Sequence, residues 1–273
     1  MLDVLAVTDC CRAWRTNVKY AAQLAARFDG SLTGLYAPCE APIPPTLPVP
    51  SVDEELKEEF NDERWIARHA AGEFRTWASH LGVERADWQL AGEEPRDVIV
   101  RASNWHDVVV LERNTEPDGW CTEHLAQLVT SVQTPCLIVP SDAGDFRLHT
   151  VAIAWNGSPE SVRAVHAALP LLRRAGRVVL IQGARIQPFA GTMWPRAASI
   201  EDYLAWQKVL VEPIVLDTTP DQAGAKILFE AGNVGADLLV MGAFGRARFA
   251  ERWFGGATLH ALRNAHFPLF MRH

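Results

Sequence analysis

The segment Asp237–Gly245 reads DLLVMGAFG and decides the fold. Its unbroken apolar run, Leu238–Met241, is typical of a parallel strand that is buried on both faces of a sheet. Two glycines, Gly242 and Gly245, end this run, and after nine intervening residues the segment 255–258 (GGAT) begins a predicted helix. A strand, a glycine turn and a helix in this order predict a layer of parallel strands that alternate with helices.

The chain repeats this plan, because three pairs of segments resemble each other. They are Asp3–Asp9 with Thr150–Asn156, Asp107–Leu111 with Asp237–Met241, and Thr134–Val139 with Phe267–Met271. The members of these pairs lie 147, 130 and 133 residues apart. The repeat predicts two copies of one fold, a first domain over residues 1–143 and a second over residues 147–273, with a boundary near residue 145.

Each half alternates short apolar runs with longer amphipathic segments. In the second half the expected strands are Val151–Ala154, Arg177–Gly183, Ile214–Leu216, Leu238–Met241 and Leu269–Met271. The expected helices are Ser158–Arg174, Ser199–Val209, Ala223–Val234 and Gly256–Ala265. The sequence therefore predicts an α/β protein with two tandem open, doubly wound, parallel five-stranded sheets. In the first half it also predicts one long helix from Ser51 towards His80.

The composition excludes several classes of protein. Of 273 residues, 48% are hydrophobic and 22% are charged, and 26 Lys and Arg against 33 Asp and Glu give a net charge of −7. This balance argues against a dedicated nucleic-acid binder, which carries a basic excess. No apolar run approaches the roughly 18 residues of a membrane span, so we expect neither a nucleic-acid nor a membrane partner.

The start of the chain and its cysteines indicate a reducing compartment. Met1 is followed directly by a predicted strand, without a basic and cleavable leader, so we expect a cytoplasmic protein. The five cysteines all lie in the first half and form no CxxC pair, and an odd number favours free thiols. Cys10 and Cys11 directly follow Asp9, and both a redox role and a structural role as buried thiols stay open for them.

Motifs for catalysis are absent from the sequence. It contains no P-loop, no GxGxxG after the first strand of either half, no GxSxG and no HExxH. Its nine histidines are scattered without the spacing of metal ligands. We therefore name no catalytic residue and no metal site, and we expect any nucleotide hydrolysis to be slow.

The glycine segments of the second half suit a phosphate group. Glycines at the carboxyl end of a strand let the backbone approach a ligand closely. Amide groups at a helix N-terminus, here 255–258, favour an anion. Arg246, Arg248 and Arg252 lie between the two segments, where they could contact phosphate. The alternative is that the glycines only serve tight turns and that the arginines lie on a solvated face.

The spacing Gly-x2-Gly-x9-Gly, followed by a small residue, resembles the nucleotide-binding signature of the universal stress protein family. The resemblance covers both halves in tandem and includes the DLLVMG strand, the FGGAT helix start and the PLF last strand. It implies the strand order 3-2-1-4-5 in each half, with ATP held where strands one and four diverge. It also implies that the last strands of the two halves pair as an intrachain pseudo-dimer, with further pairing as a homodimer open.

The resemblance also assigns binding residues in the second half. The phosphate cradle corresponds to Gly242, Gly245, Gly255, Gly256 and Ala257, the acidic position after the first strand to Asn156, and the strand beside adenine to Gly183. The chain departs from the family at Asn156, where aspartate is usual, and at Gly256, where Ser or Thr is usual. Backbone amides survive both changes, so the resemblance implies binding of ATP, with or without magnesium.

The first half keeps Asp9 but loses the glycines. The positions that correspond to Gly242 and Gly245 are Glu112 and Thr115. A carboxylate repels a phosphate placed beside it. We therefore expect a degenerate first domain that binds no nucleotide.

Three functions stay open at this point. The leading hypothesis is a cytosolic stress-response regulator or sensor that binds adenine nucleotide in its second domain and acts through protein partners that the sequence does not identify. The runner-up is a dimeric interaction module that has lost nucleotide binding, and the departures at Asn156 and Gly256 favour it. The third, a nucleotide-hydrolysing enzyme, is supported by no residue of the sequence.

Overall fold

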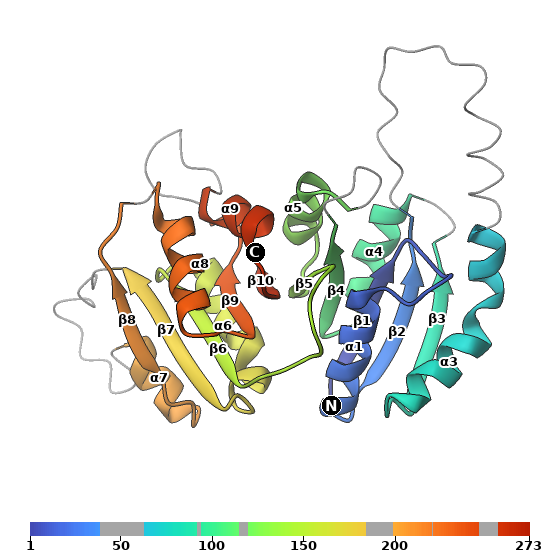
Figure 1. Cartoon of the computed structure of the whole chain (residues 1–273), viewed down its shortest axis with the longest axis horizontal. Helices are drawn as coiled ribbons and strands as arrows, with labels where there is room; N and C mark the ends of the chain where they lie inside the picture. Colours follow the sequence, from blue (N-terminus) through green and yellow to red (C-terminus); the bar gives the residue numbers. More distant parts are fainter. Residues whose placement is uncertain (39–62, 92–93, 115–119, 184–198, 220, 246–255) are drawn as a thin grey trace, which may run out of the picture. The chain divides into compact units, whose positions relative to one another are not determined.

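The structure, a computed structural model, describes residues 1–38, 63–91, 94–114, 120–183, 199–219, 221–245 and 256–273. The chain divides into two compact units, which can be followed along the colours of Figure 1. The first unit comprises Met1–Thr134 with Ile138–Asp145, and the second comprises Phe146–His273 with Pro135–Leu137.

The first unit alternates strands and helices along the chain. Its strands are β1 (Asp3–Thr8), β2 (Ser31–Tyr36), β3 (Arg85–Leu90), β4 (Val108–Arg113) and β5 (Cys136–Pro140), and its helices are α1 (Thr16–Arg27), α3 (Ala71–His80), α4 (Pro95–Ser103) and α5 (Thr122–Ser131). The strands lie in the order β3-β2-β1-β4-β5. β1 pairs in parallel with both β2 and β4, so it is the central strand.

The second unit has the same plan. Its strands are β6 (Thr150–Trp155), β7 (Arg177–Gly183), β8 (Glu212–Leu216), β9 (Leu238–Gly242) and β10 (Leu269–Arg272), and its helices are α6 (Pro159–Leu172), α7 (Ile200–Trp206), α8 (Ala223–Asn233) and α9 (Gly256–Asn264). The strands lie in the order β8-β7-β6-β9-β10, and β6 pairs in parallel with β7 and β9. Both units therefore confirm the predicted order 3-2-1-4-5, and every strand and helix predicted in the second half is present.

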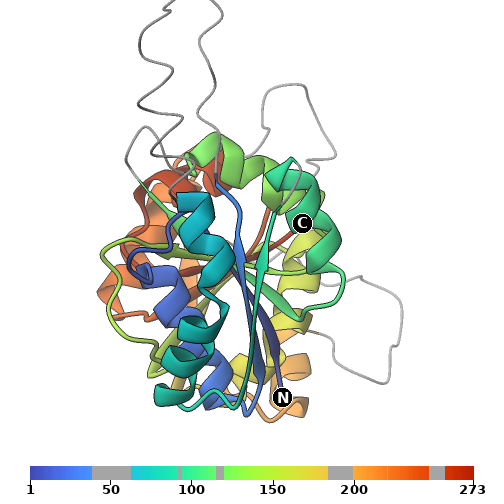
Figure 2. The same ribbon diagram turned by 90° about the vertical axis from the view of Figure 1, so that its right-hand side faces the viewer.

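Helices cover both faces of the sheets. In the first unit α1 and α3 lie on one side of the strands and α4 lies on the other, as Figure 2 shows. In the second unit α6 packs on β9 and β10, and α8 packs against α9. The strands between these layers are buried, for example at Ile153 and Val240, which are both 0% exposed. This burial explains why the strands are unbroken apolar runs.

Helix α6 begins where the sequence predicts. Ser158 is its N-cap, because the Ser158 Oγ accepts a hydrogen bond from Ser161 N at 3.2 Å. Pro159 occupies the first helical position, where a backbone N–H would have no hydrogen-bond partner within the helix, so its absence costs nothing. The start of α6 is thus set by local sequence.

The long helix expected from Ser51 is interrupted. Residues 63–69 are helical, Ala70 forms a turn and α3 follows it, while residues 51–62 lie outside the described part of the chain. Trp88 Nε1 donates a hydrogen bond to Ala67 O at 2.7 Å. This bond engages the carbonyl that a continuous helix would offer to residue 71.

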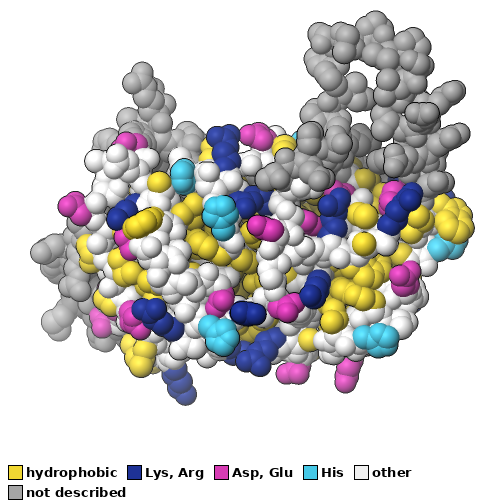
Figure 3. All heavy atoms as spheres, in the orientation of Figure 1, with side chains coloured by type: hydrophobic (Ala, Val, Ile, Leu, Met, Phe, Trp, Pro, Cys, Tyr) yellow, Lys and Arg dark blue, Asp and Glu magenta, His cyan; other side chains and the backbone are white. Residues whose placement is uncertain are grey.

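The described surface carries charges of both signs. Lys and Arg side chains alternate with Asp and Glu side chains over the face shown in Figure 3. Within the described ranges, no helix has both the length and the apolar character that crossing a membrane requires.

Candidate functional site

The carboxyl ends of β6 and β9 form the candidate nucleotide site of the second unit. The two strands pair in parallel up to Ala154 and Met241, and β7 lies beyond β6 while β10 lies beyond β9. A parallel sheet opens a crevice at such a switch point, because the connections leave the two strands towards opposite faces. Asn156 and Gly242, at the ends of these strands, lie at this edge of the sheet.

Asn156 shapes the turn between β6 and α6. Its Oδ1 accepts a hydrogen bond from Ser158 N at 3.1 Å. Gly157, between these two residues, has a φ of +73°, a left-handed conformation that favours glycine. Asn156 itself is exposed. Its side-chain oxygen is thus engaged in the turn, and its amide group is the part that can contact a ligand.

Both turn glycines lie close to the start of α6, and close packing accounts for the glycine at position 242. A Cβ atom on Gly242 would lie 2.5 Å from Ser161 N and 2.7 Å from Glu160 C, which are backbone atoms at the start of α6. A Cβ atom on Gly245 would lie 2.8 Å from Glu160 Oε2 and 3.6 Å from Ser158 Oγ. Contact with the backbone of α6 therefore requires glycine at position 242, independently of any bound phosphate, whereas at position 245 the neighbouring atom is the end of the Glu160 side chain, which can move.

Glu160 is the residue of this site that the sequence analysis misses. It is 7% exposed, and its Oε1 accepts a hydrogen bond from Arg163 Nη2 at 3.0 Å. Its Oε2 has no hydrogen-bond partner among the described residues. In the sequence Glu160 is an ordinary acidic residue in the first turn of a helix, so no local signal distinguishes it. The structure places its carboxylate against Gly245, at the predicted phosphate cradle.

The first turn of α9 adjoins the glycine turn. Phe244 N donates a hydrogen bond to Thr258 Oγ1 at 3.2 Å. Phe244 has a φ of +51°, which is uncommon for a bulky residue. Gly256 is exposed, and a Cβ atom there would meet no described heavy atom within 4 Å. Ala257, which follows it, is half-buried. Among the described residues, nothing therefore occupies the space beside Gly256 at the N-terminus of α9.

The remaining predicted residues are placed differently. Gly183 ends β7, is exposed and has open space at its Cβ position. Gly255 and the three arginines of the glycine loop lie outside the described residues. The structure thus brings Asn156, Gly242 and Gly245 to the start of α6, and it leaves Gly183 at the end of the neighbouring strand.

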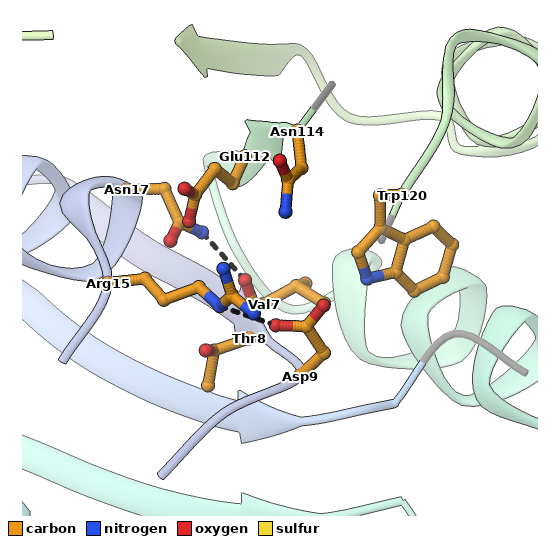
Figure 4. Close-up of a pocket in the computed structure, with 8 residues that line it drawn as sticks. All are labelled: Val7, Thr8, Asp9, Arg15, Asn17, Glu112, Asn114 and Trp120. Atoms are coloured by element: carbon orange, nitrogen blue, oxygen red, sulfur yellow. Dashed lines mark hydrogen bonds and ion pairs between the residues drawn. The ribbon is translucent and has the colours of Figure 1, made fainter. Parts of the chain in front are cut away.

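The corresponding crevice of the first unit holds a small pocket, shown in Figure 4. Its lining consists of Val7, Thr8, Asp9, Arg15, Asn17, Glu112, Asn114 and Trp120. Arg15 Nε lies 2.7 Å from Asp9 Oδ1, and Asn17 Nδ2 donates a hydrogen bond to Val7 O at 2.7 Å. Burial raises the pKa of Asp9 above its usual value, and the positive charge of Arg15 opposes this shift.

The charges of this pocket disfavour a phosphate. Asp9 and the buried Glu112 bring two carboxylates to the lining, and Arg15 is the one guanidinium among the lining residues. A phosphate would enter beside carboxylates that burial has already removed from much of the solvent. The degenerate first domain stays a prediction, and Thr115, on which it also depends, lies outside the described residues.

The described residues offer no metal centre, and the thiol of Cys11 is buried. Among them, no group of three or more His, Cys, Asp or Glu side chains could hold a metal ion. Cys11, after β1, is 5% exposed. Burial raises the pKa of the Cys11 thiol, and the carboxylate of Glu63 raises it further. The reactive thiolate of Cys11 is therefore scarce at neutral pH, which favours its structural role.

Comparisons with known proteins agree with this architecture. The model of the universal stress protein family matches residues 148–272. The structure of a universal stress protein from Archaeoglobus fulgidus DSM 4304 aligns with 15% identity and a TM-score of 0.65, over 99% of this chain and 96% of its own. A structure assigned to the same family, from Pseudomonas aeruginosa UCBPP-PA14, aligns with 11% identity and a TM-score of 0.59, over 99% of this chain and 93% of its own.

At these identities the two structures show the fold alone. A universal stress protein in complex with cAMP aligns over 52% of this chain and 98% of its own, with 17% identity and a TM-score of 0.34, a likeness too low to say what this chain binds. A comparison with curated proteins finds no match. The family model therefore shows a universal stress protein domain over residues 148–272.

Proposed function

We propose that the second unit binds adenine nucleotide, with ATP as the ligand, and that the chain acts as a stress-response regulator through protein partners. The observation that carries this proposal is the N-terminus of α9 at Gly256, where the described residues leave open space and which adjoins the glycine turn through the bond between Phe244 N and Thr258 Oγ1. Amide groups at a helix N-terminus bind anions. The switch point beside them is where parallel sheets hold nucleotides.

Each residue of the proposed site then has a role. The backbone amides of Gly256 and Ala257 would donate hydrogen bonds to phosphate oxygens. The amide group of Asn156 would donate to a ribose hydroxyl, and the exposed end of β7 at Gly183 would lie against adenine. We assign no residue to catalysis, so we expect little or no hydrolysis of ATP.

Two substitutions at Gly256 test the site. Gly256→Asp places a carboxylate where space is open and where a helix N-terminus favours an acidic residue, so the fold should persist while phosphate is repelled. We expect calorimetric titration with ATP to show at least about tenfold weaker binding than the wild type. Gly256→Ser adds only a hydroxyl in the same open space and is the matched control, which should bind at least as tightly as the wild type. Equal affinity of the two variants would remove this site assignment.

The alternative function is an interaction module without a bound nucleotide. The buried carboxylate of Glu160 against Gly245 favours it, because this charge opposes a phosphate. The same titration separates the two functions. One nucleotide per chain supports the proposed site and a degenerate first domain, two would contradict the degenerate first domain, and none would support the interaction module.

Location and assembly stay predictions for this chain. We expect a cytoplasmic protein whose last strands pair as an intrachain pseudo-dimer, with further pairing as a homodimer open. Mass measurement of the purified chain in solution by light scattering distinguishes a monomer from a homodimer.

A further inference from the structure

Glu160 places a negative charge where the proposed function requires phosphate to bind. A Cβ atom on Gly245 would lie only 2.8 Å from Glu160 Oε2, and the residue is 7% exposed. We propose that Glu160 makes the second unit selective for nucleotide whose phosphates carry a divalent cation and that it excludes the metal-free form. This inference rests on the proposed nucleotide site and names the form of nucleotide that the site takes.

Arg163 neutralises Glu160 from one side. Its Nη2 donates to Glu160 Oε1 at 3.0 Å, and its Nε donates to His273 O at 3.1 Å. The side chain of Arg163 is 44% exposed, whereas that of Glu160 is 9% exposed. Glu160 Oε2, the oxygen against Gly245, receives no hydrogen bond from any described residue. The carboxylate therefore presents an unsatisfied acceptor to the glycine turn.

A divalent cation would offset the negative charge of this carboxylate. A buried acceptor without a donor is costly, and carboxylate and phosphate oxygens are the ligands that Mg²⁺ prefers. The described residues supply no group of three acidic, His or Cys side chains that could hold a metal by itself. We therefore expect the cation to arrive with the nucleotide, bound to its phosphates, and to offset the negative charge of Glu160 there.

Metal-free nucleotide carries no cation that could offset the charge of Glu160. Its phosphates would bring further negative charge beside a carboxylate that is largely removed from solvent. Charges within a few ångströms of each other shift a pKa by about 1–3 units, which changes the equilibrium constant about tenfold to a thousandfold. We therefore expect Glu160 to weaken the binding of metal-free ATP by at least about tenfold.

Calorimetric titration of the full chain with ATP tests the inference, once in excess Mg²⁺ and once in EDTA. The wild type should bind ATP at least about tenfold more tightly in Mg²⁺ than in EDTA. Glu160→Gln keeps the shape of the side chain and an acceptor oxygen for Arg163, but it removes the charge. Its affinity for ATP in EDTA should rise by about tenfold or more, so that the preference for the magnesium form collapses.

Two further variants control this result. Glu212→Gln changes the net charge equally, but Glu212 begins β8, at the opposite end of the sheet from the glycine turn, and its carboxylate pairs with Arg177. The ratio of the affinities of Glu212→Gln for ATP in Mg²⁺ and in EDTA should match that of the wild type. Arg163→Gln removes the cation that neutralises Glu160 and should increase the preference for the magnesium form.

Two outcomes would overturn these conclusions separately. If Glu160→Gln leaves the ratio of affinities in Mg²⁺ and EDTA unchanged while ATP still binds, the role of Glu160 is refuted and the nucleotide site stands. If the wild type binds ATP in neither buffer, the proposed function itself fails.

Discussion

Adding one methyl group at Gly242 should destabilise the second unit. The new Cβ atom would lie 2.5 Å from Ser161 N, 2.7 Å from Glu160 C and 2.9 Å from Glu160 Cβ. The two nearest atoms belong to the backbone of α6 and cannot rotate away as the end of a side chain can, so α6 must move away from β9. Overpacking of this kind costs about 1–3 kcal/mol. We expect Gly242→Ala to lie in the upper part of that range.

Hydrogen exchange measures this cost in each unit separately. Amides of β6 and β9 report the free energy of unfolding of the second unit, and amides of β1 and β4 report that of the first, whereas one melting curve would mix two domains. Gly183→Ala is the matched control, because a Cβ atom at Gly183 has open space around it. It should change the free energy of unfolding by less than about 1 kcal/mol.

Two results would refute this reasoning. If Gly242→Ala leaves the second unit within about 0.5 kcal/mol of the wild type, then α6 does not press against β9 at this point. If the variant keeps its stability but no longer binds ATP, then Gly242 serves the approach of a ligand and not the packing of α6.

Two further predictions concern the cysteine thiols and the carboxylate of Asp9. Iodoacetamide at mildly alkaline pH should label the half-buried Cys10 and Cys121 but not Cys136, which is 1% exposed and whose thiol pKa burial raises to about 12. Mass spectrometry of the peptides measures this, and rapid labelling of native Cys136 would contradict its burial. Burial also raises the pKa of Asp9 in the folded state above the ordinary value of 3.8. Deprotonation of Asp9 is therefore less favourable in the folded chain than in the unfolded chain. The free energy of unfolding of the wild type should fall, relative to that of Asp9→Asn, as the pH rises above 3.8. Urea unfolding of both proteins at a series of pH values tests this, and a difference that stays constant with pH would count against it.

The strands and helices were predictable because each element carries its own signal, whereas the strand order followed from the resemblance to the universal stress protein family. β9 is an unbroken apolar run that ends in glycine, and α6 carries an N-cap serine followed by proline. These features act within a few residues, so they can be identified from the chain alone. The interruption of the helix at Ala70 was not predictable, because Trp88 engages the carbonyl of Ala67 from 21 residues further along the chain.

The candidate site also has features that the sequence predicts and features that only the folded structure shows. Sequence spacing alone located the glycine turn at Gly242 and Gly245 and the helix start at Gly256, because glycine spacing is a property of the chain. Only the tertiary structure decided that the backbone of α6 lies against Gly242 and that the side chain of Glu160 is buried against Gly245. A residue loses its solvent through whatever packs over it. For Glu160 the covering segment is the turn after β9, which is distant in sequence and close only after folding.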